Sequence, residues 1–461
     1  MHPTVQLICL FGSVFVYCFA IGIYGAIIPN FIQQKVCSSD VQPDLDTPCN
    51  NTDTVLEATD IATTRGVIRE AVPVFILLLA GSWRDATGLN KPLMYSALVG
   101  EIVGVFVQLL ATWKWSMSIW TASIAEAVLY GASGGSKLFY VAATCAVTDQ
   151  SNDDQRTTRL AFYQVAAYAG SCLSSGLSGY SLHFLGYLWF FIMVISLHVL
   201  TIVLVIFSKE AENRLKKDEK AKIFQKLKAI TKSRPNNLVV WLMLISCVII
   251  NVCASAESNL YLYYLQLTFD FTVKEAGLYS AFRLMFGVVS TMILSPVFTK
   301  VLKWSDFRIG ILSSFITLIA TTSMIFARTI VHLIVFALLD FLKIFVYTLP
   351  MSIVTKCVKS DEVGIFVSLR FIGGCLSPMF VFYLYDIIFS ATSHKMPGAF
   401  FIASASITLL VFLSFWISSC IYTEPVVLLQ NNSTIDSDAE KRKSDEISEN
   451  NGFIEKALPA A

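Results

Sequence analysis

Ionisable side chains inside long apolar stretches are the strongest chemical signal in this sequence. An ion at the centre of a lipid bilayer costs at least about 2.5 to 3.5 kcal/mol, so such a side chain normally faces a cavity or a partner. Tyrosine rings accompany several of these charges, and rings beside a few charges suit an organic anion with an apolar body. The residues predicted to bind a solute or to couple its movement are Glu126, Lys137, Glu257, Tyr261, Asp340, Lys343 and Arg370.

The spacing of two of these pairs is informative. Glu126 and Lys137 are eleven residues apart, which places both on one face of a single helix. Asp340 and Lys343 are three residues apart, so they either face a cavity or simply neutralise each other within one helix. The sequence leaves this alternative open.

Four other charges favour structural roles. Glu101 and Arg283 are interpreted as structural partners between helices. Arg69 and Glu70 are interpreted as side chains that snorkel at the outer interface. Tyrosines near helix ends are also typical of an interfacial belt, which is the alternative to a solute-binding role for them.

The elements that position these side chains are predicted from the scarcity of charge. Charged residues make up only 15% of the 461 residues, against about 25% in soluble domains. A helix of about 20 apolar residues crosses a bilayer with its backbone groups satisfied internally. We therefore predict an all-α membrane protein with twelve transmembrane helices, at residues 5–31, 71–83, 92–113, 117–147, 160–184, 186–207, 238–269, 276–298, 309–326, 331–353, 363–389 and 399–422.

The distribution of cations predicts orientation and organisation. Lys and Arg collect in the loops and tail that face inwards if both termini are cytoplasmic. We predict an N-terminal six-helix half (1–207), a cytoplasmic linker (208–237), a C-terminal six-helix half (238–422) and a disordered cytoplasmic tail (423–461). The formal net charge of +1 gives no basic surface for nucleic acid. The predicted outward loops contain only six cations: Lys35, Arg65, Lys114, Lys274, Arg328 and Lys395.

Two short inward loops carry a recognisable pattern. The first contains Gly81, Asp85 and Gly88, at the spacing G-x-x-x-D-x-x-G. This loop resembles the signature of the major facilitator superfamily, whose two six-helix halves rock about a site at the middle of the membrane. Leu89 and Asn90 stand where that signature has a basic pair.

The second inward loop narrows the resemblance. It contains Asp149 and the run from Arg156 to Arg159, and together with the first loop it is similar to solute carrier family 46, the group that includes the proton-coupled folate transporter. The resemblance implies an inner gate at Gly81, Asp85, Gly88, Asp149, Arg156 and Arg159.

Departures from the folate carrier limit what the resemblance implies. Gln164 occupies the place of its proton-coupling glutamate, while Cys253 and Met351 lie near the places of a histidine and a substrate-binding arginine. A neutral amide cannot titrate, so that proton route is missing. Candidate cargoes are folate-like compounds, sterol conjugates and muropeptides. The last two agree better with the absence of the folate carrier's coupling residues.

The predicted function is secondary-active transport of a small organic solute by alternating access, with proton symport as one option. The alternative is a non-transporting membrane receptor or scaffold that keeps the transporter fold, which Leu89 and Asn90 favour. A membrane enzyme ranks third, because the sequence has no constellation of acid, base and nucleophile and no cofactor or metal motif.

Processing and sorting signals lie outside the predicted helices. Cys37 and Cys49 share an outward loop, where they form either a disulfide or two free thiols, and Asn50 is a glycosylation acceptor beside them. Glu424, Leu428 and Leu429 form either an acidic dileucine signal, read by sorting adaptors, or the interfacial end of the last helix. The predicted location is therefore the plasma membrane or the endolysosomal membrane.

Overall fold

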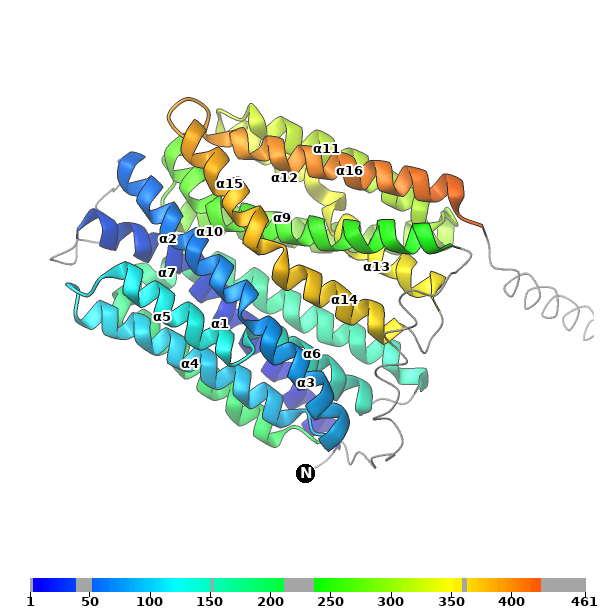
Figure 1. Cartoon of the computed structure of the whole chain (residues 1–461), viewed down its shortest axis with the longest axis horizontal. Helices are drawn as coiled ribbons and strands as arrows, with labels where there is room; N and C mark the ends of the chain where they lie inside the picture. The colour runs from blue at the N-terminus through cyan, green and yellow to red at the C-terminus, as the bar shows by residue number, and fades with distance from the viewer. Residues whose placement is uncertain (1–2, 39–51, 151–152, 211–235, 359–362, 424–461) are drawn as a thin grey trace, which may run out of the picture.

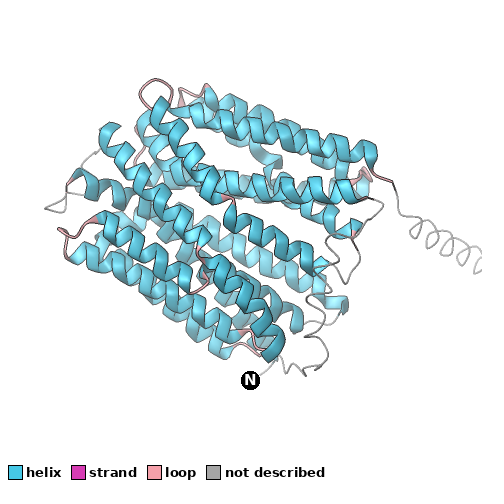
Figure 2. Cartoon of the chain, in the orientation of Figure 1, coloured by secondary structure: helices cyan, strands magenta, loops and turns pink. Residues whose placement is uncertain are grey.

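Helices account for nearly all of the residues described in the computed structural model, namely 3–38, 52–150, 153–210, 236–358 and 363–423, and these ranges contain no strand (Figure 2). The N-terminal helices are α1 (Pro3–Cys37), α2 (Thr52–Ala71), α3 (Pro73–Thr87), α4 (Lys91–Trp113), α5 (Ile119–Ala132), α6 (Gly135–Asp149) and α7 (Asp153–Phe207). The C-terminal helices are α9 (Asn237–Phe269), α10 (Val273–Pro296), η1 (Val297–Val301), α11 (Asp306–Ile325), α12 (Ile330–Leu339), η2 (Asp340–Leu342), α13 (Lys343–Cys357), α14 (Val363–Leu376), α15 (Pro378–Thr392), η3 (Pro397–Ala399) and α16 (Phe400–Ile421).

The predicted all-α membrane fold is confirmed, and twelve crossings can be counted along the described helices. Nine segments of the described residues are long and apolar enough to cross a bilayer. One of them, Phe162–Phe207, contains two crossings, because α7 is interrupted at Gly186, where φ is 65° and ψ is 171°. The pairs α2–α3 and α5–α6 supply the two remaining crossings, each made of two helices in succession.

The second crossing starts much earlier in the chain than predicted. Its outer part is α2, which begins at Thr52 rather than near Ala71. Arg65 was therefore wrongly assigned to a loop: it lies inside α2 and is buried. The apolar-run criterion failed because α2 carries several charges. Three of them, Arg65, Arg69 and Glu70, form ion pairs with other helices.

The fourth crossing is broken between Glu126 and Lys137. Gly134 (φ 91°) and Gly135 (φ 55°) adopt left-handed conformations that favour glycine, so α5 ends before α6 begins. A Cβ on Gly134 would lie 2.6 Å from Leu138 Cδ2. The prediction that Glu126 and Lys137 share one face of a continuous helix is therefore wrong.

The two groups of helices, α1–α7 and α9–α16, lie side by side (Figure 1). They meet where α2 packs along α15 and where α7 packs along α10. Asn259 Nδ2 donates to Ala62 O at 3.2 Å and Tyr263 OH donates to Pro29 O at 3.2 Å. These contacts lie near the end of the bundle that carries residues 114–118 and 326–329, which we call the predicted outer end.

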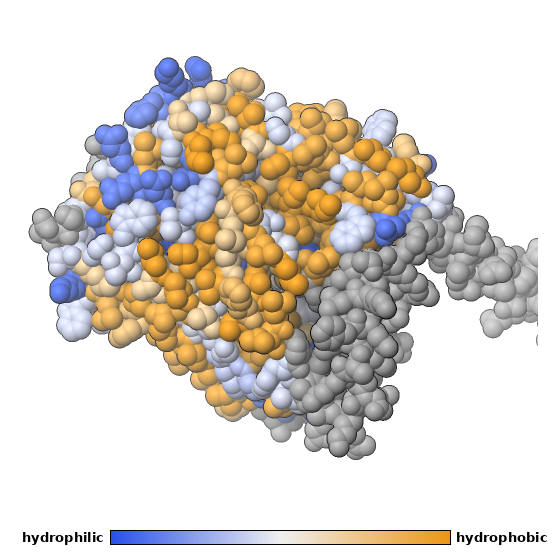
Figure 3. Space-filling view, viewed as in Figure 1, coloured by the Kyte–Doolittle hydropathy of each residue, from blue (hydrophilic) through white to orange (hydrophobic). Residues whose placement is uncertain are grey.

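The outer surface of the bundle is suited to lipid. Figure 3 shows apolar side chains covering most of one face, with polar side chains gathered mainly at one end. Large apolar side chains are exposed on the outside of the bundle: Trp113, Phe184 and Phe380 are 81%, 80% and 78% exposed. A surface of this kind is stable in a bilayer and prone to aggregation in water.

Candidate functional site

Three adjoining cavities surround Ser258 of α9, which lines all of them, and two of the three lie where the two groups of helices meet. The C-terminal cavity, about 270 Å³, is lined by α9, α10, η2 and α13. The inter-half cavity, about 440 Å³, lies between α1, α2, α9 and α15. The serine cavity, also about 270 Å³, lies between α1, α7, α9 and α10. Together they form a group of neighbouring cavities around the middle of α9.

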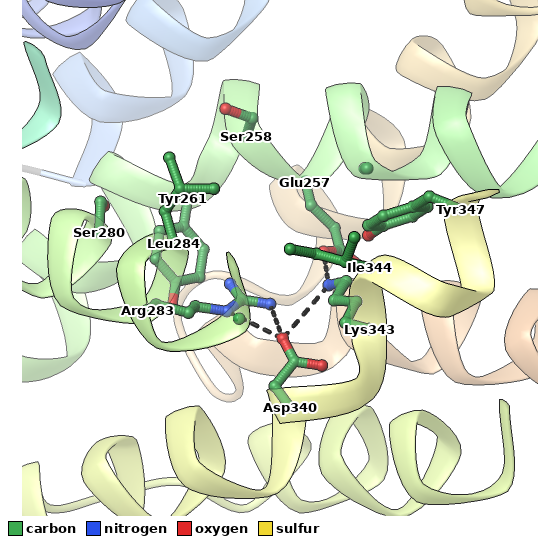
Figure 4. A pocket seen from close by; sticks show the side chains of 12 residues that line it. Glu257, Ser258, Tyr261, Ser280, Arg283, Leu284, Asp340, Lys343, Ile344 and Tyr347 are labelled. Carbon is green, nitrogen blue, oxygen red and sulfur yellow. Dashed lines mark hydrogen bonds and ion pairs between the residues drawn. The ribbon is translucent and has the colours of Figure 1, made fainter. Parts of the chain in front are cut away.

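The C-terminal cluster, defined as Glu257, Arg283, Asp340 and Lys343, lines the first cavity (Figure 4). Arg283 Nε and Nη2 lie 2.9 and 2.5 Å from Asp340 Oδ2. Lys343 Nζ lies 3.3 Å from Glu257 Oε2 and 3.7 Å from Asp340 Oδ2. Tyr261 lines the same cavity, with its ring 5.5 Å from the Arg283 guanidinium.

This geometry resolves the alternative left open for Asp340 and Lys343. The two do form an ion pair within one crossing, but Asp340 lies closer to Arg283 of a different helix. Arg283 is thus both an interhelical partner and a cavity residue. The prediction that Glu257, Tyr261, Asp340 and Lys343 face one cavity agrees with where the structure places them.

The N-terminal cluster, defined as Tyr17, Arg65, Arg69, Glu101 and Glu126, is the counterpart in the other half. Glu126 Oε2 lies 2.6 Å from Arg65 Nε, and Glu126 Oε1 accepts from Arg65 Nη2 at 3.1 Å and from Arg69 Nη1. Tyr17 OH donates to Glu101 Oε1 at 3.1 Å, and Arg69 Nη2 lies 3.8 Å from Glu101 Oε2.

Only the arginines of the N-terminal cluster line the inter-half cavity. Glu126 is 1% exposed and does not line this cavity, so it binds the two arginines on their buried side. The interpretation of Arg69 as a snorkelling side chain is wrong, because its guanidinium is bound to Glu126 and lies 3.5 Å from the Tyr130 ring centroid. Sequence reasoning missed Arg65. A signal was available, since Arg65 and Arg69 at i and i+4 precede an apolar run and share one helix face.

Lys137 of α6 connects the two halves. Its Nζ binds Glu70 Oε2 and lies 3.2 Å from Gly374 O and 3.3 Å from Cys375 Sγ, both on α14. The Gly374 carbonyl is open to such a donor because Pro378, four residues later, has no N–H to donate. Glu70 lines the inter-half cavity and pairs with Lys137, so it does not simply snorkel to an interface.

The two halves repeat one plan. In each, the second crossing supplies an arginine, Arg69 from α2 or Arg283 from α10, to an acid on the fourth crossing, Glu126 or Asp340. In each, the fourth crossing also departs from regular α-helix in the stretch that begins at that acid and ends at a lysine, Lys137 or Lys343. Left-handed glycines interrupt it in one half and the short 3₁₀ helix η2 interrupts it in the other.

Arg370 lies apart from this centre. It is partly exposed on α14, is not among the lining residues of the three cavities, and has the ring of Phe371 5.9 Å from its guanidinium. The structure therefore does not bring it together with the other predicted binding residues.

The predicted inner gate is described in part. Asp149 accepts from Arg84 Nη2 at 3.0 and 3.1 Å and from Asn90 Nδ2 at 2.8 Å, while Arg84 Nε donates to Asn90 Oδ1 at 2.8 Å. Asn90, which replaces a basic residue of the family pattern, thus bridges Asp149 to Arg84, a cation that sequence reasoning missed. Gly88 ends α3 with a left-handed φ of 71°.

Other predicted residues are described less fully. Arg159 donates to Gln150 O. The surroundings of Gly81 and the side chains of Asp85 and Arg156 lie outside the described parts of the chain. Cys37 is disulfide-bonded, but Cys49 lies outside the described residues, so their pairing stays a prediction. The other predicted residues that lie outside the described ranges are Asn50, Glu424, Leu428 and Leu429.

The arrangement can bind charged solutes but offers no evident metal site. Within the described ranges, no group of three His, Cys, Asp or Glu residues could hold a metal ion. The cations of both clusters are held by carboxylates at the wall of a cavity, so an incoming anion can compete with those carboxylates for them.

Comparisons with known proteins agree with this geometry. The family model described as Major Facilitator Superfamily matches residues 10–382. The chain is 23% identical over 367 residues to the probable peptidoglycan muropeptide transporter SLC46 of Drosophila melanogaster, covering 72% of this chain and 68% of that protein. It is 24% identical over 213 residues to the lysosomal proton-coupled steroid conjugate and bile acid symporter SLC46A3 of Gallus gallus, covering 42% of this chain and 45% of that protein.

A solved structure shows the same fold at low sequence identity. A peptide transporter crystallised with alafosfalin superimposes with a TM-score of 0.66 at 12% identity, over 92% of this chain and 96% of that one.

Proposed function

Because the chain belongs to the major facilitator superfamily and is similar to its solute carrier 46 members, we propose that it transports a small organic anion by alternating access. One observation carries the proposal: both halves present paired cations to adjoining cavities, Arg65 and Arg69 to the inter-half cavity and Arg283 and Lys343 to the C-terminal cavity. A site shared by both halves changes its exposure when the halves rock.

The lining predicts what the anion looks like. Its acidic group binds a guanidinium or ammonium in place of a resident carboxylate, as bidentate arginine contacts allow. Its apolar body packs on Tyr261, Leu284 and Phe382, which line the same cavities. The names of the two relatives give steroid conjugates, bile acids and muropeptides: the first two combine an acidic group with an apolar body, and muropeptides supply acidic groups.

The finer parts of the proposal concern coupling and location. We infer symport with protons, as the name of the chicken relative states for that protein, and residence in the endolysosomal or plasma membrane with both termini cytoplasmic. The outer-loop disulfide of Cys37 with Cys49, glycosylation at Asn50 and sorting through Glu424, Leu428 and Leu429 belong to the same proposal.

Uptake of radiolabelled taurocholate, estrone sulfate and a muropeptide into proteoliposomes containing the purified full-length chain tests this proposal. Lys343→Gln removes a cation from the C-terminal cavity, and we expect it to reduce uptake about tenfold, which corresponds to roughly 1.4 kcal/mol of binding. Lys343→Arg should retain more activity, because it keeps the charge.

The matched control is Lys114→Gln, which removes an exposed cation from the predicted outer end and should leave uptake unchanged. Wild-type protein that moves none of the three probes above the level of empty vesicles would contradict the proposal. Equal losses in Lys114→Gln and Lys343→Gln would contradict the assignment of the site.

A further inference from the structure

The two carboxylates of the N-terminal cluster share its arginines unequally. Glu126 receives three guanidinium contacts, from Arg65 Nε, Arg65 Nη2 and Arg69 Nη1. Within the described residues, Glu101 forms an ion pair only with Arg69, at 3.8 Å, which is beyond hydrogen-bond distance. It accepts a hydrogen bond from the neutral Tyr17 hydroxyl at 3.1 Å. Glu101 is nevertheless almost as buried, at 2% exposure against 1% for Glu126.

Because Glu101 is almost as buried as Glu126 but has fewer cationic partners, we expect it to accept a proton more readily than Glu126 does. A buried carboxylate needs a counter-ion or several hydrogen bonds to stay charged. Glu126 has both, whereas Glu101 has one phenol and a distant guanidinium. A neutral Glu101 carboxyl still accepts from Tyr17 through its carbonyl oxygen, so protonation leaves this contact in place.

Protonation also changes the charge presented to the cavity. With both acids ionised, two arginines and two glutamates are balanced. With Glu101 neutral, the cluster is left with one excess positive charge, on arginines that line the inter-half cavity. Arg69 is the arginine that loses one of its two carboxylate partners while it keeps Glu126, and its side chain is 16% exposed.

We propose that Glu101 is the proton-binding residue of this carrier and that its protonation leaves Arg69 with one carboxylate partner and able to bind the organic anion in the inter-half cavity. The proton and the anion then bind together, because each compensates the charge of the other. This inference rests on the proposed transport function and assigns its coupling site to the third crossing, α4.

Other titratable groups approach this site from the surrounding helices. Those that face Glu101 or its partner Tyr17 are Arg65 and Arg69 on α2, Glu126 and Tyr130 on α5, Tyr140 on α6 and His198 on α7. His198 is the rival proton acceptor. Its ring centroid lies 6.0 Å from that of Tyr17, and neither ring nitrogen has a hydrogen-bond partner among the described residues. The experiment therefore includes a His198 variant.

Taurocholate binding and counterflow in proteoliposomes, measured from about pH 5.5 to about pH 8, test the proposal. Wild type should bind more tightly as the pH falls. Glu101→Gln fixes the neutral form, so its affinity at about pH 7.5 should equal the acidic wild-type value and should vary less than about twofold across the range. It should keep counterflow but lose accumulation driven by a proton gradient.

Two further variants keep the test decisive if Glu101→Gln does not fold. Tyr17→Phe removes the hydrogen bond that favours the charged carboxylate, so the midpoint of the pH profile should move to higher pH. His198→Gln should leave the profile as in wild type. An unshifted midpoint in Tyr17→Phe, a wild-type profile in Glu101→Gln, or a flat profile in His198→Gln would each overturn the inference.

Failure of the inference differs from failure of the proposed function. If Glu101→Gln exchanges taurocholate with the wild-type pH dependence, only the proton site is wrong. If the wild-type protein neither binds nor exchanges any of the three probes, the transport proposal fails with it.

Discussion

At the scale of single residues, the cavity charges depend on one another. Asp340 accepts hydrogen bonds from Nε and Nη2 of Arg283 and also pairs with Lys343. Asp340→Asn would leave two cations near Glu257 alone, and removing one partner of a buried pair typically costs about 3–5 kcal/mol. We expect a clear fall in the thermal unfolding midpoint of the detergent-purified protein, measured by intrinsic fluorescence.

A compensated variant separates charge balance from lost packing. Asp340→Asn combined with Arg283→Gln restores neutrality, so most of the lost stability should return. A double variant no more stable than Asp340→Asn would show that ion pairing is not the cause.

The residues that line the cavities were easier to predict from the sequence than the ion pairs between helices. Glu257, Tyr261, Asp340 and Lys343 were recognisable because charges and rings are conspicuous in apolar runs. The pairing of Arg65 with Glu126 was not, because the two are far apart in sequence and only tertiary packing brings them together. Arg370 shows the converse: an intramembrane charge need not line the central cavity.

At the scale of elements, interruptions of the helices create the inter-half contacts. The break between α14 and α15 at Pro378 leaves the Gly374 carbonyl free of a helical hydrogen bond, and Lys137 donates to it. The same ammonium group lies against the Cys375 thiol. The sequence predicted one run over 363–389 because Pro378 is apolar and does not interrupt the pattern. Backbone hydrogen bonding, not hydropathy, decides where such a crossing breaks.

Pro378→Ala tests this contact. The new N–H can bond to Gly374 O, so Lys137 loses one acceptor and α14 is held less firmly against α6. Cys375, fully buried in this state, should then react several-fold faster with a methanethiosulfonate reagent in a background with Cys420 replaced.

Lys137→Met should produce the same increase in Cys375 labelling. Pro350→Ala, within α13, is the control and should leave the labelling rate unchanged. If the Cys375 labelling rate is unchanged in Pro378→Ala, or unchanged in Lys137→Met, the contact does not restrain α14.

At the scale of the whole molecule, closure at the predicted outer end depends on two helices that approach closely. A Cβ on Gly179 of α7 would lie 2.4 Å from the Lys274 Cα, at the start of α10, and backbone at that distance cannot yield cheaply. Gly179→Ala should therefore hold the halves apart at this end, abolish net transport and increase labelling of Asn259→Cys by an impermeant thiol reagent added outside.

Gly176→Ala is a control on the same helix, one turn away, where the new Cβ would meet Ala281 Cβ at 3.4 Å, an ordinary contact. It should transport as wild type does and leave Asn259→Cys protected. This comparison tests the transport cycle itself, because a receptor with a fixed fold has no need to close and reopen this end. If Gly179→Ala transports normally, closure between α7 and α10 is not part of the cycle and the solute passes by another route.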